Sequence, residues 1–168
     1  MEVTLDGTPF KLLGDKPLIK VGDEARDAWL VNDQLQEVHL NKFFDKLCVI
    51  STFPSLDTPT CDVQCRTLMT TYAGRKDLNL VSISEDLPFA QAKWCLNLHF
   101  ANTIVLSDYI DHNFGYTYGL FIDKLHLLAR SVMIIKNKKV VYFELVKEQD
   151  DQVNFDALEK AIKENLKE

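Results

Sequence analysis

The chain lacks an excess of positive charge. Its 168 residues include 19 Lys and Arg against 25 Asp and Glu, which gives a formal net charge of −6. Nucleic acids and anionic membrane surfaces select for clustered Lys and Arg. The one dense basic stretch, residues 136–139, is interrupted by Asn137. The composition therefore argues against nucleic acid or an anionic membrane as a main partner.

Long apolar runs are also missing. The first ten residues carry Glu2 and Asp6 and do not fit a signal peptide, and no later segment is long enough to span a bilayer. We therefore expect a cytoplasmic protein, in which cysteines are thiols at rest. The chain has four of them, Cys48, Cys61, Cys65 and Cys95. Any disulfide between them is expected to be catalytic rather than structural.

The spacing of a structural metal site is absent as well. Four cysteines and four histidines (His39, His99, His112 and His126) would suffice in number. However, no C-x2-C pair and no pair of histidines three to five residues apart occurs, so we expect no metal and no cofactor. The missing C-x2-C motif also argues against a thioredoxin-like protein that acts on disulfides.

The elements that are present predict an α/β protein. Apolar residues make up 46% of the chain and charged residues 26%, and there are no repeats or low-complexity linkers, so we expect one domain over residues 1–168. Buried strands are predicted over residues 47–53, 78–84 and 103–106. Helices are predicted over residues 58–73, from a cap at Asp86 to about His99, and over 154–166.

Shorter elements complete the predicted order. A hairpin is expected over residues 3–13 with its turn at Asp6-Gly7, short strands over 28–31 and 37–40, and a second hairpin over 131–136 and 140–146. Strands that alternate with helices, followed by a hairpin and a final helix, indicate an α/β layered fold, and the order β-α-β-α-β-β-α is that of thioredoxin-like domains. We therefore predict a thioredoxin-like fold with a central mixed β-sheet flanked by helices and an N-terminal β-hairpin.

Cys61 is the candidate nucleophile. It follows a predicted strand-to-helix connection, and sites form at this carboxyl edge of α/β sheets. Thr58 suits the N-cap and Pro59 the first helical position, so Cys61 is the third helical residue. A thiolate there is stabilised by the unsatisfied amides of the first turn and by the helix dipole. The alternative is an inert buried cysteine, which is how we interpret Cys48 in the middle of an apolar strand.

The stretch around Cys61 resembles the active site of a known family. Pro54-x3-Thr58-x2-Cys61 is similar to the signature of the peroxiredoxins, and the chain resembles the bacterial thiol peroxidases, their atypical two-cysteine branch. Further matches follow in family order over nearly the whole chain. They are Asp86-Leu87-Pro88-Phe89-Ala90-Gln91, Trp94-Cys95, Leu106-Ser107-Asp108, Phe114-Gly115-x2-Tyr118-Gly119 and Leu128-Ala129-Arg130-Ser131-Val132.

The resemblance implies a thiol-specific peroxidase that reduces hydrogen peroxide and organic hydroperoxides. Cys61 corresponds to the peroxidatic cysteine and Cys95 to the resolving cysteine, which would form an intramolecular disulfide recycled by thioredoxin. Thr58 matches the hydroxyl that binds thiolate and peroxide, Arg130 the arginine that polarises the peroxide, and Pro54 the proline that shields the site. Homodimers and a role in antioxidant defence are also implied.

The residues alone leave alternatives open. Arg130 could be an ordinary surface residue and Thr58 only a helix cap, and pattern alone makes Cys95 a core cysteine. A peroxide-sensing signalling protein that uses the same cysteine is the second candidate function. The sequence also departs from the family pattern: Pro59-Thr60 replaces Gly-Val, Arg26 replaces a proline, and Cys65 is an additional cysteine. We interpret Cys65 as a bystander, because residues four apart on an intact helix pair poorly.

Overall fold

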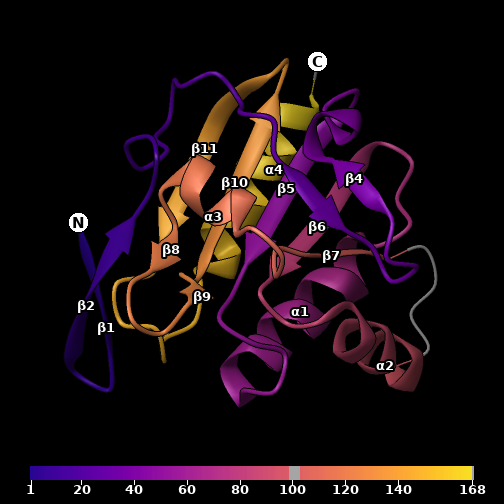
Figure 1. The fold of residues 1–168 in the computed structure, drawn as a ribbon. Helices are drawn as coiled ribbons and strands as arrows, with labels where there is room; N and C mark the ends of the chain where they lie inside the picture. Colours follow the sequence, from indigo (N-terminus) through magenta and orange to yellow (C-terminus); the bar gives the residue numbers. More distant parts are fainter. Residues whose placement is uncertain (99–102, 168) are drawn as a thin grey trace.

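The fold is built on a seven-stranded mixed sheet (Figure 1). The computed structural model describes residues 1–98 and 103–167. Across the sheet the order is β11-β10-β5-β6-β7-β3-β4, with β5, β6 and β7 parallel and the other pairs antiparallel. Its strands are β3 (Trp29–Val31), β4 (Glu37–His39), β5 (Leu47–Thr52), β6 (Leu78–Ser84), β7 (Ile104–Ser107), β10 (Ser131–Lys136) and β11 (Lys139–Leu145).

A second, smaller sheet is antiparallel and contains the N-terminal hairpin. Its order is β1-β2-β8-β9. The strands are β1 (Glu2–Leu5), β2 (Thr8–Leu13), β8 (Phe121–Ile122) and β9 (Leu127–Leu128). The hairpin turn has Asp6 at φ 49° and Gly7 at φ 78°, which is the left-handed backbone that the Asp-Gly pair predicts.

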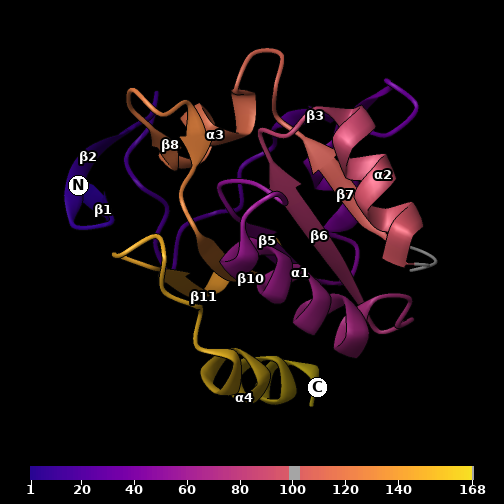
Figure 2. The same ribbon diagram turned by 90° about the horizontal axis from the view of Figure 1, so that it is seen from below.

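Strand β5 is buried along its whole length because both faces of the sheet are covered. Val49 points into one apolar cluster and Ile50 into the other. Helices α1 (Pro59–Tyr72) and α4 (Phe155–Leu166) lie on the same side of the sheet (Figure 2). Both supply side chains to the first cluster. Helix α3 (Asn113–Tyr118) and the small sheet cover the opposite face. This double cover explains why the sequence of β5 shows no polar alternation.

Helix α2 (Pro88–Leu98) lies beside α1 (Figure 1). The two helices are joined by a hydrogen bond of 2.8 Å that Trp94 Nε1 donates to Asp62 Oδ1. The end that we predicted near His99 lies outside the described residues. None of the helices in the described part of the chain is long and apolar enough to cross a membrane.

The thioredoxin-like order predicted from the sequence is confirmed, and the mismatches are short elements. The sequence did not predict β8, β9, the 3-10 helix at Leu40–Phe43 or α3. Helix α3 has six residues, and its first turn depends on Asp108, which accepts hydrogen bonds from the Phe114 and Gly115 amides at 2.8 and 2.9 Å. A helix of six residues is too short for a periodic pattern of apolar residues to predict it.

One predicted cap is wrong. We expected Asp86 to cap α2, but the helix begins at Pro88 and the Gln91 amide donates to the Leu87 carbonyl. The Asp86 carboxylate instead accepts hydrogen bonds from Ser55, Leu56 and Ser84. Hydrogen bonds from the loop after β5 and from Ser84 of β6 therefore take the place of the local capping bond.

Candidate active site

Cys61 occupies the third position of α1, as the sequence predicted. Thr58 is the N-cap, and its hydroxyl oxygen accepts a hydrogen bond of 3.4 Å from the Cys61 amide. Pro59 takes the first helical position, where its missing N–H costs nothing. The Cys61 side chain is completely buried in a small cluster with Phe53, Leu56 and Cys65. A thiolate at this position lies at the positive end of a 14-residue helix.

Arg130 lies directly against this sulfur. Its Nη2 is 3.2 Å from Cys61 Sγ, although the two residues are 69 positions apart in the sequence. Strand β10 pairs antiparallel with β5, and Ser131 stands opposite Thr52, so the residue before β10 reaches the end of β5 from which the α1 loop departs. Arg130 is only 2% exposed. The alternative of an ordinary surface residue is therefore wrong.

Neutral oxygen atoms hold the Arg130 guanidinium in place. Its Nη1 donates to Gln64 Oε1 at 2.8 Å, and its Nε donates to the Gln149 carbonyl at 3.0 Å. The Arg130 amide also donates to Gln149 Oε1 at 2.6 Å. A buried cation needs such partners to replace water. Because these acceptors carry no full charge, the positive charge remains available to the sulfur.

Gln64 and Gln149 are the residues that sequence reasoning missed. Both are essentially fully buried, and Gln64 Nε2 is fixed by Ser51 Oγ and the Thr52 carbonyl at 2.8 and 3.2 Å. Gln64 lies three residues after Cys61 and therefore shares its helix face. That spacing was a usable signal. Gln149 lies in the segment after β11, where no pattern marked it.

Thr58 and Pro54 both lie in the loop that leads to Cys61. The Thr58 hydroxyl donates to the Ser55 carbonyl at 3.1 Å while it caps the helix. Pro54 is buried at the end of β5, next to Phe53 of the apolar cluster around the thiol. The structure thus shows Thr58 as the cap of the helix that carries the candidate nucleophile, and Pro54 as a buried residue of the loop that leads to it.

The other three cysteines have different surroundings, and all four are free thiols. Burial raises the pKa of Cys48, which lies within β5. Burial also raises the pKa of Cys65, with a further contribution from nearby Cys61 and Cys95. Cys95 is half-buried on α2, and burial raises its pKa too. None of these three thiols has a guanidinium hydrogen-bonded to its sulfur among the described contacts.

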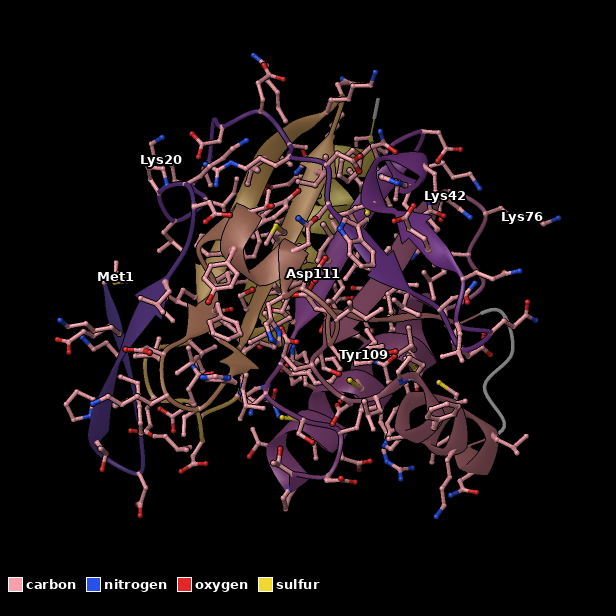
Figure 3. The ribbon with its side chains drawn as sticks, viewed as in Figure 1. Met1, Lys20, Lys42, Lys76, Tyr109 and Asp111 are labelled. Carbon is pink, nitrogen blue, oxygen red and sulfur yellow. The ribbon has the colours of Figure 1, made fainter. Side chains whose placement is uncertain are left out.

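Cys95 faces a cavity of about 660 Å³ that Cys61 does not line. Apolar side chains of Val38, Phe43 and Leu106 form part of its wall, and Lys42, labelled in Figure 3, belongs to its lining. In this reduced state the two sulfurs are therefore not bonded and belong to different surroundings. Within residues 1–98 and 103–167, no group of three His, Cys, Asp or Glu side chains is placed to hold a metal ion.

This arrangement suits nucleophilic displacement. The helix N-terminus and the guanidinium hydrogen-bonded to the sulfur are placed to stabilise negative charge that develops at or next to that sulfur. Together with the thioredoxin-like sheet, these features define the class of cysteine-based oxidoreductases.

Comparisons with known proteins narrow the class. The redoxin family model matches residues 20–162. The chain is 41% identical over 156 residues to a thiol peroxidase of Bacillus subtilis, covering 92% of each chain. It is 38% identical over 161 residues to a thiol peroxidase of Streptococcus parasanguinis, covering 95% of this chain and 97% of the relative.

A solved structure agrees with these relatives. A peroxiredoxin-like protein from Aquifex aeolicus superimposes with a TM-score of 0.88 at 38% identity, covering 97% of this chain and 96% of that protein. The chain therefore belongs to the redoxin family and, within it, to the thiol peroxidases. Its activity is that of a peroxidase oxidoreductase.

Proposed function

We propose that the chain reduces hydrogen peroxide and organic hydroperoxides by attack of the Cys61 thiolate on a peroxide oxygen. The observation that carries this proposal is the 3.2 Å contact between Arg130 Nη2 and Cys61 Sγ at the start of α1. An S–O bond forms and the O–O bond breaks, which leaves a sulfenic acid and an alkoxide or hydroxide that takes up a proton. The guanidinium stabilises the thiolate and then the departing oxygen.

Thr58 and Pro54 have supporting roles in this proposal. The Thr58 hydroxyl is close enough to the Cys61 backbone to turn from the Ser55 carbonyl towards a bound peroxide. Pro54 keeps water from the sulfur, in keeping with its burial at the end of β5. Loss of the Thr58 hydroxyl should slow Cys61 oxidation more than loss of the Thr60 hydroxyl, which binds the Asp150 carbonyl at 3.2 Å.

We further propose that Cys95 resolves the sulfenic acid within one chain. The Cys95 thiol displaces the sulfenic oxygen as water and forms an S–S bond with Cys61. Since Cys61 is completely buried and Cys95 lies on α2 at another cavity, this step requires local unwinding around the two cysteines. Thioredoxin then reduces the disulfide, which fits a single-domain cytosolic enzyme of antioxidant defence.

Peptide mapping without reductant tests the resolving step. A dominant Cys61–Cys95 peptide pair within one chain is expected after one equivalent of peroxide. The Cys95→Ser variant should react once, accumulate sulfenic and then sulfinic forms, and lose thioredoxin-dependent turnover. A dominant Cys61–Cys65 pair or an interchain disulfide would overturn the role of Cys95 and leave that of Cys61 standing.

A coupled assay tests the overall function. Hydrogen peroxide and alkyl hydroperoxides should each be consumed at the expense of NADPH when thioredoxin and its reductase are present. Stoichiometric oxidation without turnover would favour the peroxide-sensing alternative. We also propose a homodimer, because the large apolar side chains of Leu87 and Phe89, which follow β6, and of Ile110, which follows β7, are about half or more exposed. Light scattering of the reduced protein checks this state.

A further inference from the structure

Asp86 is tied to the loop that carries the active site. It follows β6 and is separated from this loop by about thirty residues of sequence. Its carboxylate accepts hydrogen bonds from Ser55 Oγ at 2.7 Å and from the Leu56 amide at 2.9 Å. Ser84 Oγ donates to the same carboxylate at 2.7 Å. Hydrogen bonds to an ionised carboxylate are about twice as strong as neutral ones, so Asp86 is a firm anchor for residues 55 and 56.

The anchored residues lead directly to the nucleophile. The Ser55 carbonyl accepts hydrogen bonds from the Thr58 amide and hydroxyl at 3.2 and 3.1 Å. The Thr58 hydroxyl oxygen in turn accepts the bond from the Cys61 amide. A continuous series of hydrogen bonds therefore runs from the Asp86 carboxylate to the turn of α1 that presents the sulfur to Arg130.

The same carboxylate is connected to the helix of the second cysteine. Ser84 Oγ, which donates to Asp86, accepts a hydrogen bond of 3.0 Å from Gln91 Nε2 on α2. Gln91 lies one helical turn before Cys95, and it is 1% exposed. Asp86 thus joins the loop before Cys61 to the first turns of the helix that carries Cys95. A movement of Cys61 towards Cys95 must therefore break these contacts. While they remain, Cys61 stays in its position.

We propose that Asp86 is a positioning residue that holds residues 55–61 in the conformation that reacts with peroxide and restrains the opening that forms the disulfide. The inference rests on the proposed function, since it concerns the two steps of that reaction. It predicts specific changes in the rates of these two steps. Loss of the anchor must slow the oxidation of Cys61 and speed the condensation of the sulfenic acid with Cys95. A residue needed only for general stability would not change the two steps in opposite directions.

Rapid-quench measurements on Asp86→Asn separate the two steps. Reduced protein is mixed with hydrogen peroxide, and the thiol, sulfenic acid and disulfide forms are counted by mass spectrometry over time. We expect oxidation of Cys61 to slow by about tenfold, as misplacement of a reacting group commonly costs a factor of that order or more. Disulfide formation should become several-fold faster, and amide exchange at residues 55–61 should increase.

Asp27→Asn is the matched control. The Asp27 carboxylate also accepts one hydrogen bond from a backbone amide and one from a side chain: the Asn41 amide and His39 Nδ1 both donate at 3.0 Å. These bonds fix the segment around β4 and not the loop before Cys61. Both steps should keep their wild-type rates in this variant. If Asp86→Asn does not fold, Ser55→Ala removes one of the three bonds and carries the same test with a change of about threefold.

The outcomes distinguish this inference from the function on which it rests. Parallel changes in the two rates, or no change in either, would overturn the role of Asp86 while wild-type turnover kept the peroxidase proposal intact. A wild-type protein whose Cys61 does not react with peroxide would instead overturn the proposed function.

Discussion

Two buried polar clusters lie at the same edge of the central sheet. They differ in whether the buried group keeps its charge. In the first, Arg130 is held by the neutral oxygens of Gln64 and Gln149, and its charge is directed at Cys61. In the second, Glu85 after β6 lies against Asp108 after β7. Tyr109 and Asp111, labelled in Figure 3, continue the chain from Asp108.

In the second cluster Glu85 retains its proton and Asp108 is the carboxylate beside it. Burial, and then the nearby Asp108, raise the pKa of Glu85 far above its ordinary value, and burial also raises the pKa of Asp108. Glu85 Oε2 is 2.8 Å from His112 Nδ1, and burial lowers the pKa of that histidine. The Asp108 carboxylate of this cluster accepts hydrogen bonds from amides in the first turn of α3 and so fixes that helix. The comparison shows that a buried charge surrounded by neutral partners remains free for chemistry, whereas one of two crowded carboxyl groups keeps its proton and the pair serves the fold.

The largest expected effect is in the first cluster. Cys61→Ser should abolish peroxidase turnover, because no other cysteine combines a helix N-terminus with a guanidinium on its sulfur. Cys48→Ser is the matched control and should retain activity, since Cys48 lies buried within β5. Thioredoxin-dependent consumption of peroxide is the measurement. Substantial activity in the Cys61 variant would show that the wrong thiol has been assigned.

Arg130→Lys should slow Cys61 oxidation by about 100-fold, comparable to the loss of one fixed donor in other enzymes. Lysine keeps the charge, but its donors share one nitrogen and cannot reproduce the fork whose separate nitrogens reach Gln64, Gln149 and the sulfur. Stopped-flow rates with hydrogen peroxide provide the check. Rates equal to those of the wild type would mean that the positive charge alone, and not its forked geometry, is what the site requires.

Gln64→Leu should slow the same step by about tenfold, because the guanidinium would lose one of the bonds that aim it. The free energy of unfolding should also fall by about 1–3 kcal/mol, the usual cost of a buried donor left without an acceptor. Chemical denaturation and stopped-flow kinetics measure the two effects. A loss of stability with unchanged kinetics would assign Gln64 to the fold alone.

The smallest effect is expected in the second cluster. Glu85→Gln mimics the protonated acid, so activity should not change. Because the pKa of Glu85 is raised in the folded state, the folded protein binds a proton that the unfolded chain has released, and stability falls as pH rises above the ordinary carboxyl pKa. The variant should be more stable by about 1 kcal/mol at pH 8 and show a flatter pH dependence.

Thermal melts from pH 5 to pH 9 measure this difference, with Glu164→Gln as a control that makes the same substitution at an exposed position. An identical pH slope for wild type and Glu85→Gln would mean that Glu85 is ionised in the folded protein, and the contrast between the two clusters would disappear.

The sequence predicted the parts of this molecule that depend on local pattern. The strands around Cys61, the Thr58 cap and the third helical position of the cysteine follow from propensity and spacing, and the structure confirms them. It did not predict what depends on strand pairing. Gln149 reaches Arg130 only because β11 returns beside β10. The Asp86 carboxylate, which we expected to cap α2, instead binds the loop that follows the neighbouring strand β5. Such contacts are set by the tertiary fold and leave no periodic trace.

The central claim is that Cys61, held against Arg130, is the thiol that peroxide oxidises. The most direct test is to treat reduced Cys95→Ser protein with one equivalent of hydrogen peroxide in the presence of dimedone and to map the labelled residue by mass spectrometry. The account predicts that the sulfenic-acid adduct forms on Cys61 and that its rate of formation falls when Arg130→Lys is added. An adduct formed mainly on Cys48 or Cys65, with Cys61 left as a thiol, would contradict it.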